Sequence, residues 1–479
     1  MTSKFDTRIQ MLKYRVISEV IKAFDNGDMS KIFIDIPKAV SPGPKPTLRC
    51  CIYKERAVTQ ERIRMALGGD KENPNIVEVL DPACDECPIS GMYITPACRG
   101  CIVHKCQESC PKGAITIVNN HPIIDMTKCI KCGRCAKACP YNAIIEQKRP
   151  CVKSCPVKAI SIDTDDKAKI DNSKCIACGA CVYQCPFGAI TDKSFIIDAL
   201  QILKDSQNGA KYPVYAIVAP AIASQFKDNR LGQVVTAINK LGFTKVVEAA
   251  LGADITLHKE VIEFEEKGLM TTSCCPSFVM FIEKNFPELA QYISTSPSPM
   301  VETANLIKRK NKKAKTIFIG PCTSKKLEFK LPKTKGAIDC VISFEELQAF
   351  IDARGIDLDS LEETPLLDAS NYGRAFAKCG GIVDDVKKMA QQMNIDNIKP
   401  ISMNGIAECN VNLLKLKLGK AGENFFEGMA CDGGCLNGAL CLHHDIRNIN
   451  EIDKFSNEAQ YKDINHAVEM YEESLDEQQ

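Results

Sequence analysis

The chain of 479 residues is long enough for about three domains at roughly 150 residues each, and its 45% hydrophobic content allows each domain to bury a core. Its 61 Lys and Arg against 60 Asp and Glu give a formal net charge of +1, so the overall basic bias of a nucleic-acid-binding protein is absent. The longest uncharged apolar run, residues 214–223, is far shorter than the ~18–20 residues of a membrane span, so we expect neither nucleic acid nor membrane as a partner.

Residues 1–80 are predicted to form a mostly helical N-terminal region. Apolar residues recur at helical spacing from Ile9 to Phe24, and a proline-rich break follows at residues 41–46. The first residues carry charges where a signal peptide has its apolar stretch, so we expect a cytoplasmic protein. The adjacent Cys50 and Cys51 have no further ligand at metal spacing, and we predict that they are buried structural thiols.

Residues 81–200 are rich in cysteine and proline and contain an internal repeat. Sixteen of the 27 cysteines lie here, and a reducing cytoplasm disfavours disulfides, so metal binding is the default interpretation. The spacing C-x2-C-x2-C-x3-C-P occurs unbroken from Cys129 and again from Cys175, with a longer middle gap from Cys98, and in truncated form at Cys151 and Cys155. In this motif three close thiolates hold one 4Fe-4S cluster, and the fourth ligates a neighbouring cluster.

Exchange of fourth ligands between the copies predicts four complete 4Fe-4S clusters. The predicted ligand sets are Cys98, Cys101, Cys106 and Cys139; Cys129, Cys132, Cys135 and Cys110; Cys175, Cys178, Cys181 and Cys155; and Cys84, Cys87, Cys151 and Cys185. A four-cysteine zinc site is the alternative for part of the region, and its ligands would be Cys84, Cys87, Cys98 and Cys101. That alternative leaves two cysteines of the repeat without partners.

The repeat resembles bacterial two-cluster ferredoxins in duplicate, and this resemblance implies electron transfer. Residues 98–200 carry 15 Lys and Arg against nine Asp and Glu, which favours an acidic electron carrier of the ferredoxin type as partner. No glycine-rich nucleotide motif of the G-x-G-x-x-G or P-loop kind is visible in the sequence, so we do not expect direct NADH oxidation by this chain alone.

From residue 201 onward, apolar strand-like pieces alternate with helix-spaced segments, which predicts an α/β domain. Three segments stand out in it: TTSCCPSF at 271–278, GPCTSKKLE at 320–328 and EGMACDGGCLNG at 427–438. Each follows a short apolar piece, so their cysteines are expected at the carboxyl ends of strands, where open α/β sheets place their sites. The tail from residue 465 to 479 is acidic and is predicted to end in a solvated helix.

These three segments resemble the signature motifs of the FeFe-hydrogenases, and with the ferredoxin-like region the resemblance spans roughly residues 81–440. It implies an H-cluster, which is a 4Fe-4S cluster joined to a diiron unit with CO, CN⁻ and a dithiolate bridge. Cys435 would bridge the two halves, and the implied ligands of the 4Fe-4S half are Cys275, Cys322, Cys431 and Cys435. Maturation proteins that supply the diiron unit are implied as partners.

The resemblance also assigns residues around the diiron unit. Lys325 would donate to a cyanide ligand, and Met429 would pack near the bridging carbonyl. The loop that lines the unit would be Ala219, Pro220 and Ala221. Departures from the usual motifs, such as Phe278 where many relatives have Trp, suggest the group B subclass. The predicted fold class is therefore α+β and α/β multidomain, with a helical N-terminal segment, ferredoxin-like cluster domains and a two-lobed α/β H-cluster domain at residues 201–479.

A proton route is implied as well. Cys274 resembles the relay thiol beside the diiron unit, and Glu260, Glu263 and Ser294 match the other members of that relay. Lys267 stands at the outermost position, where some relatives have Arg. The alternative for the two glutamates, which lie at i and i+3 of a predicted helix, is a solvated acidic helix face.

The function predicted is the reversible reduction of protons to H2, with electrons passing through the four clusters to the H-cluster. One alternative is a hydrogenase-like iron-sulfur assembly factor, a class that lacks the relay thiol and the diiron unit, so Cys274 argues against it. A second alternative is an H2 sensor, which typically carries an added signalling domain. The remaining cysteines are interpreted as structural thiols, and His443 and His444 as an incidental exposed pair; these cysteines are Cys340, Cys379, Cys409 and Cys441.

Overall fold

The structure is a computed structural model that describes residues 4–85, 87–88, 90–464 and 466–469. Its N-terminal region consists of three helices, α1 (Arg8–Asp25), α2 (Ile32–Val40) and α3 (Ile52–Ala66). Helix α1 begins after Thr7, whose side chain accepts a hydrogen bond from Gln10 N while the Gln10 side chain accepts one from Thr7 N. Its apolar face is buried and packs against α14 (Phe344–Ala353) of the C-terminal part.

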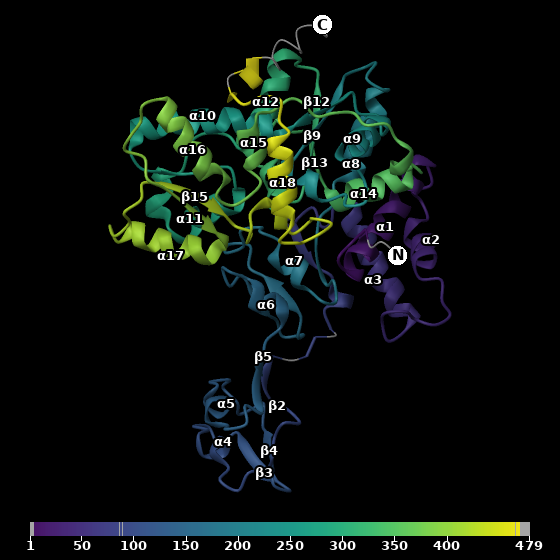
Figure 1. The fold of residues 1–479 in the computed structure, drawn as a ribbon. Coiled ribbons are helices and arrows are strands. Elements are labelled where there is room, and N and C mark those ends of the chain that lie inside the picture. Colours follow the sequence, from purple (N-terminus) through teal and green to yellow (C-terminus); the bar gives the residue numbers. More distant parts are fainter. Residues whose placement is uncertain (1–3, 86, 89, 465, 470–479) are drawn as a thin grey trace.

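The cysteine repeats form two spatially separate pieces (Figure 1). The arm, residues 91–147, projects away from the rest of the molecule. It contains two antiparallel pairs, β2 (Gly91–Ile94) with β5 (Ile144–Gln147) and β3 (Ile115–Val118) with β4 (His121–Ile124), and the helices α4 (Lys105–Glu108) and α5 (Arg134–Ala138).

The second piece, the inner cluster region at residues 148–192, lies against the body of the molecule. Its elements are α6 (Pro150–Ser154), β6 (Ile160–Ile162), β7 (Ala168–Ile170), α7 (Ala180–Gln184) and β8 (Ile190–Asp192). Strand β8 pairs with β1 (Val77–Val79), so the chain enters and leaves the repeats at the same place.

Two parallel sheets form the α/β part of the chain, as the two-lobed α/β prediction requires. The first sheet has the order β10-β9-β12-β13, with β9 (Val214–Val218), β10 (Lys245–Glu248), β12 (Lys315–Gly320) and β13 (Cys340–Ser343). The second has the order β11-β15-β14, with β11 (Met270–Thr271), β14 (Pro400–Asn404) and β15 (Phe425–Met429). The mixed α+β and α/β fold class is thereby confirmed.

Helices cover both sheets and complete the two lobes (Figure 1). The helices of this part, besides α14, are α8 (Ile196–Ser206), α9 (Leu231–Lys240), α10 (Ala249–Lys267), α11 (Pro276–Asn285), α12 (Pro299–Lys310), α13 (Thr323–Glu328), α15 (Asn371–Ala375), α16 (Gly381–Gln392), α17 (Gly405–Lys417) and α18 (Asn448–Asn457). Within the described residues, no helix combines the length and apolar character needed to cross a bilayer. The predicted acidic tail helix falls mostly on residues 470–479, outside the described residues.

A buried ionic network joins the N-terminal region, the inner cluster region and the α/β part. Lys326 is fully buried in α13, and its Nζ lies 2.8 Å from Asp192 at the end of β8 and 2.8 Å from Glu346 in α14. Lys13 of α1 bonds the same Asp192 and lies 2.6 Å from Glu345. Buried charges need partners of opposite sign, so this network holds the three regions in one arrangement.

Candidate active site

The three cysteine segments of the α/β part converge because a parallel strand ends in each of them. Strands β11, β12 and β15 end at residues 271, 320 and 429, two or three residues before the first cysteine of each segment, so the expected placement at strand carboxyl ends is confirmed. Between the two sheets they enclose a cavity of about 90 Å³. Its lining includes Ala219, Pro220, Ala221, Cys274, Cys275, Cys322, Lys325, Met429 and Cys435.

Three of four neighbouring thiols, Cys275, Cys322 and Cys435, line this cavity, and the fourth, Cys431, lies outside its lining. Burial and then the neighbouring thiolates of Cys322 and Cys275 raise the pKa of the Cys435 thiol to about 12. Cys431 lies beside the same three cysteines. Cys275 and Cys322 are also the N-cap residues of α11 and α13, so each thiol stands at a helix N-terminus, where a negative charge is favoured.

The donor set of this wall fits an iron-sulfur cluster. Four neighbouring, half-buried thiols become thiolates most readily beside a compensating cationic centre, which metal supplies. Among the residues that the structure describes, no group of three or more His, Cys, Asp or Glu is close enough to share a single metal ion.

Lys325 provides a positive charge at the cavity. Burial opposes that charge, but the adjacent Glu328 carboxylate outweighs burial and raises the pKa of Lys325. The ammonium group lies 2.7 Å from Glu328 and donates to the Cys274 carbonyl at 3.2 Å. The side chain is thereby held charged beside the four thiols, where an anionic ligand can accept its remaining N–H.

The predicted relay residues form a connected series from the cavity outward. Glu260 lies beside Cys274 and accepts a hydrogen bond from Ser273 N at 3.2 Å, and burial raises the pKa of Glu260 to about 7. Ser294 Oγ is within reach of Glu260 and donates to Glu263 at 3.0 Å. Glu263 in turn lies 2.6 Å from Lys267. The alternative of a solvated acidic face is therefore wrong for Glu260, which is fully buried.

Where the structure gives their neighbours, cysteines of the repeats lie beside members of the groups predicted from spacing, although the four complete sets and their ligation stay a prediction. Burial and then the thiolates of Cys185, Cys84 and Cys87 raise the pKa of Cys151 to about 11, so these four lie together. Cys178 lies near Cys175 and Cys155, with Cys181 near the same pair. In the arm, Cys106 lies near Cys101 and Cys139, Cys135 lies near Cys129 and Cys132, and Cys110 packs in the same apolar cluster.

This grouping disfavours the zinc alternative, because Cys84 packs with Cys151 and Cys185 in the inner core rather than with the arm cysteines. The inner cysteines also reach the cavity. Cys178 lies close enough to Cys275 and Cys431 for their charges to interact. The inner cysteines thus lead toward the cavity, and the arm lies beyond them (Figure 1).

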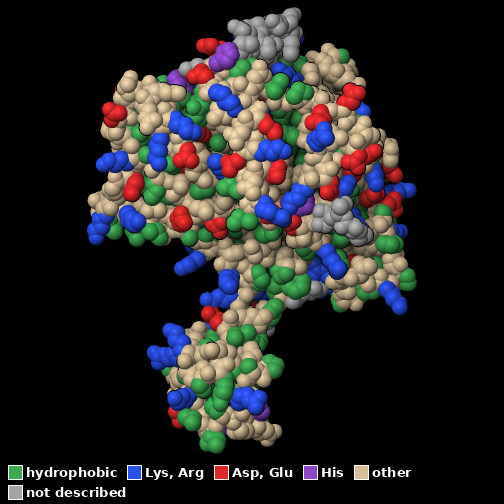
Figure 2. All heavy atoms as spheres, viewed as in Figure 1, with side chains coloured by type: hydrophobic (Ala, Val, Ile, Leu, Met, Phe, Trp, Pro, Cys, Tyr) green, Lys and Arg blue, Asp and Glu red, His purple; other side chains and the backbone are tan. Residues whose placement is uncertain are grey.

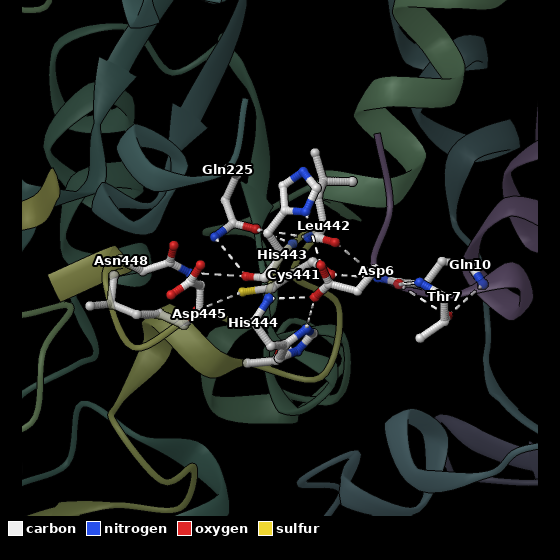
Figure 3. Close-up of polar contacts among 12 residues, drawn as sticks. Asp6, Thr7, Gln10, Gln225, Cys441, Leu442, His443, His444, Asp445 and Asn448 are labelled. Carbon is white, nitrogen blue, oxygen red and sulfur yellow. Dashed lines mark hydrogen bonds and ion pairs between the residues drawn. The ribbon is translucent and has the colours of Figure 1, made fainter. Parts of the chain in front are cut away.

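Two sequence interpretations outside the site are wrong. Cys50 is exposed and Cys51 half-buried, so the pair is not a buried structural element. His443 is buried, and both histidines contact Asp6 of the N-terminal segment, as Figure 3 shows. His444 Nε2 also lies 2.9 Å from the Gly438 carbonyl, and its ring stacks on Tyr183. The pair therefore ties the N-terminus to the loop after Cys435.

Sequence reasoning missed residues that support the site. Ser273 holds Glu260 through its backbone N–H, and its hydroxyl donates to the Ser296 carbonyl at 2.6 Å. Phe318 also lines the cavity and fills the space beside Gly320, where an added Cβ would meet its ring at 2.5 Å. In the sequence, only the position of Ser273 and Phe318 next to the cysteine motifs could have indicated that they support the site. Of the four cysteines interpreted as structural thiols, Cys379 is only half-buried, and the other three are buried.

Comparison with known proteins identifies both parts of the chain. Residues 212–439 match the model of the iron-only hydrogenase large subunit, C-terminal domain, and residues 122–145 and 168–191 match the 4Fe-4S binding domain. The chain is 31% identical over 387 residues to iron hydrogenase 1 of Clostridium pasteurianum, an alignment that covers 69% of this chain and 66% of that protein. It is 28% identical to the periplasmic [Fe] hydrogenase large subunit of Nitratidesulfovibrio vulgaris, covering 66% and 85%.

Relatives of another class match at similar identity. The cytosolic Fe-S cluster assembly factor narfl of Xenopus tropicalis is 27% identical over 266 residues, which covers 43% of this chain and 56% of that protein. Among solved structures, an FeFe-hydrogenase of Chlamydomonas reinhardtii aligns with a TM-score of 0.46 at 20% identity, covering 57% of this chain and 93% of that one.

Proposed function

We propose a hydrogenase activity for this chain, which belongs to the FeFe-hydrogenase-like proteins. The proposed reaction is the reversible reduction of protons to H2, with electrons exchanged with a ferredoxin-type carrier. The observation that carries the proposal is a cavity lined by Cys275, Cys322 and Cys435, where the Cys274 thiol stands at the head of the connected relay residues. The chain spans just under two thirds of the clostridial relative, so the activity of that whole protein enters here only as part of the proposal.

The cysteines at the wall would hold the H-cluster. In this assignment the ligands of its 4Fe-4S half are Cys275, Cys322, Cys431 and Cys435, with Cys435 linking to the diiron unit. When bound, that group supplies the metal site at which protons and electrons combine, and maturation proteins would deliver its diiron half. Lys325 holds a positive charge toward its anionic ligands, while Met429 and Ala219–Ala221 provide apolar walls that exclude water.

The relay residues would move protons between the cavity and the surface. Cys274 holds a proton at the cavity because burial raises its pKa well above the usual value. Glu260 has a pKa of about 7, so at neutral pH its carboxyl group both accepts and releases protons readily. Ser294 bridges to Glu263, and Glu263 reaches the half-exposed Lys267 at the outer end.

The cysteine groups of the repeats would carry the electrons through 4Fe-4S clusters. The arm is the outer end of this series, and its seven Lys and Arg outnumber its three Asp and Glu within residues 91–147. Figure 2 shows basic side chains over the visible face of the arm. Basic charge around an exposed cluster favours an acidic carrier, and we assign electron entry to the arm.

An iron-sulfur assembly function is the second candidate, because assembly factors match the chain at identities near those of the hydrogenases. The two candidates differ at the relay. A protein that only carries or delivers clusters has no need of a buried thiol, a carboxyl group with a pKa near 7 and a bridging serine in one connected series.

Infrared spectroscopy tests the proposal directly. The full chain, matured anaerobically in a host that supplies the diiron unit, is expected to show iron-bound CO and CN⁻ bands and to evolve H2 from a reduced carrier. Cys435→Ala should lose the bands, whereas Cys274→Ala should keep them and lose turnover, because that thiol is not a ligand. Wild-type protein with full iron content but without these bands would overturn the hydrogenase and support the assembly function.

A further inference from the structure

Two adjacent cysteines, Cys50 and Cys51, stand at the start of helix α3 and belong to none of the predicted cluster sets. They also lie outside the ranges that match the hydrogenase and 4Fe-4S models. Cys50 is exposed and Cys51 is half-buried, so the pair lies at the surface, where a molecule in solution can reach it. No step of the proposed hydrogenase mechanism uses these two thiols.

The fold holds the pair in a defined place. Cys51 is the N-cap residue of α3 and has an extended backbone, with φ −154° and ψ 160°. Glu55, one turn into the helix, accepts three backbone N–H groups of the segment before the pair, those of Thr47, Leu48 and Arg49. Lys54 Nζ lies 2.8 Å from Asp85 of the inner cysteine segment. The pair is therefore fixed where the N-terminal region meets the inner cluster region.

The surroundings of Cys51 favour its thiolate form. The backbone N–H of Lys54 lies near the sulfur and lowers the pKa of the Cys51 thiol, and the Cys50 thiol acts in the same direction. The N-terminus of a helix also favours a negative charge, and the thiolate is the nucleophilic form of cysteine. Cys379, another half-buried thiol outside the cluster sets, differs, because burial raises its pKa to about 12.

Cys50 is placed to react with whatever Cys51 binds covalently. Its thiol lies close enough to the Cys51 sulfur to hydrogen-bond it. The Cα atoms of adjacent residues are about 3.8 Å apart, which is less than the usual ~4.4–6.8 Å between the Cα atoms of a disulfide. A disulfide between these two residues would therefore be strained and easily reduced. Such a bond suits reversible exchange better than permanent cross-linking.

We propose that Cys51 and Cys50 form a thiol–disulfide exchange site that reduces the disulfide of a low-molecular-weight thiol. The Cys51 thiolate attacks one sulfur of that disulfide, which releases one thiolate and leaves the other half bonded to Cys51. Cys50 then attacks the Cys51 sulfur, and the second thiolate leaves as the Cys50–Cys51 disulfide forms. Two electrons pass from the pair to the small disulfide, and the Cys50 proton ends on one of the released thiolates.

A small disulfide is the expected substrate because Cys51 is half-buried, so a slim molecule reaches its sulfur more readily than the disulfide of a folded protein does. The site is separate from the catalytic cavity and would exist whether or not the chain is a hydrogenase.

Peptide mass spectrometry of the full chain with its clusters, treated anaerobically with glutathione disulfide, tests the proposal. Trypsin cleaves after Arg49 and Lys54, so residues 50–54 form one peptide that carries only these two cysteines. We expect this peptide to lose two hydrogens as its internal disulfide forms, and dithiothreitol to restore them. Its modification should be about tenfold or more faster than that of peptide 379–387, whose one cysteine is Cys379.

Three variants separate the roles of the two thiols. Cys50→Ser should accumulate a mixed disulfide between glutathione and Cys51, because no thiol is left to resolve it. Cys51→Ser should slow the modification of Cys50 by about tenfold or more, since the favoured thiolate is lost. Serine is a preferred N-cap residue, so α3 is retained in this variant. Cys379→Ser is the matched control and should behave as the wild type does.

Three results would overturn the proposal. Modification of residues 50–54 no faster than that of residues 379–387 would show that the pair has no special reactivity. A mixed disulfide that persists in the wild type as it does in Cys50→Ser would remove the resolving role of Cys50. A wild-type rate in Cys51→Ser would remove the role of the Cys51 thiolate. Because the readout is the mass of a peptide, none of these results depends on H2 turnover.

Discussion

The arm and the catalytic cavity both gather cysteines, but they do so by different physical means. In the arm, two complete cysteine groups lie within 42 positions, and only a small cluster of buried side chains packs around them: Met92, Cys106, Ile115, Cys135 and Ile144. In the catalytic part, which is the α/β region from residue 201 onward, the four cysteines are spread along the chain from Cys275 to Cys435, and two parallel sheets with extensive apolar cores bring them together. Because the arm has so small an apolar core, we expect bound metal to stabilise its fold, whereas packing of the two sheets can shape the cavity without metal.

Removal of iron should have the largest effect, because it should unfold the arm and leave the catalytic part folded. We expect an anaerobic chelator to unfold the arm, since its apolar core is too small to hold its fold without clusters. Hydrogen exchange should then show complete loss of protection in β2 and β5 and retained protection in β9 and β12. Reconstitution with iron and sulfide is the control and should restore the arm. Persistent protection of β2 in the iron-free protein would contradict the dependence on metal.

Loss of the relay thiol should leave structure intact and remove activity. Cys274→Ala is expected to lower the H2 evolution rate by about 10²–10⁴-fold, the usual contribution of a positioned proton-transfer group. Iron content and the infrared bands should not change. The matched control is Cys340→Ala, a buried thiol in β13 that bonds the Phe195 carbonyl away from the cavity. Equal rates in the two variants would remove Cys274 from the proton route.

The buried ionic network should determine the stability of the catalytic part but not of the arm. Lys326→Met leaves Asp192 and Glu346 buried without this cation, and we expect a loss of about 3–5 kcal/mol in the free energy of unfolding. The exposed Lys417, which lies 2.6 Å from Glu288, is the control, and Lys417→Met should cost under about 1 kcal/mol. Urea unfolding followed by circular dichroism compares them, and similar midpoints would contradict the network's role.

The two regions should also respond to pH with opposite sign. Burial raises the pKa of Asp385 in α16 to about 8, so the folded catalytic part binds more protons than the unfolded chain between about pH 4 and pH 8. Its stability should therefore fall as pH rises through this window. In the arm, a hydrogen bond from the Thr127 hydroxyl lowers the pKa of Asp125, so stability there is lost as pH falls.

Asp385→Asn should reduce the change in the free energy of unfolding of the catalytic part between about pH 4 and pH 8, by on the order of 2 kcal/mol. The measurement is urea unfolding at several pH values, with the exposed Asp384→Asn as the neighbouring control. If the free energy of unfolding of Asp385→Asn varies with pH as steeply as that of the wild type, other buried carboxyl groups, such as Asp368, cause the pH dependence.

Sequence spacing by itself predicted which cysteines group together and that strands lead into the three segments. The repeats of the arm and inner region are local, so their predicted pairing follows from a few residues of separation, and the apolar pieces before residues 271, 320 and 427 end within three residues of the strand ends. The chemistry of Cys274, Glu260 and Ser294 was accessible only through resemblance, because residue type and periodicity alone favoured a solvated helix face.

Tertiary structure alone decided burial and the neighbours that come from distant segments. It buried Glu260 and raised its pKa, buried His443 against Asp6, and left Cys50 exposed. A side chain's pKa and hydrogen-bond partners depend on the groups packed around it, and those groups arrive from segments separated by tens to hundreds of residues. Local spacing carries no information about such contacts, so they follow only from the folded arrangement of the sheets and helices.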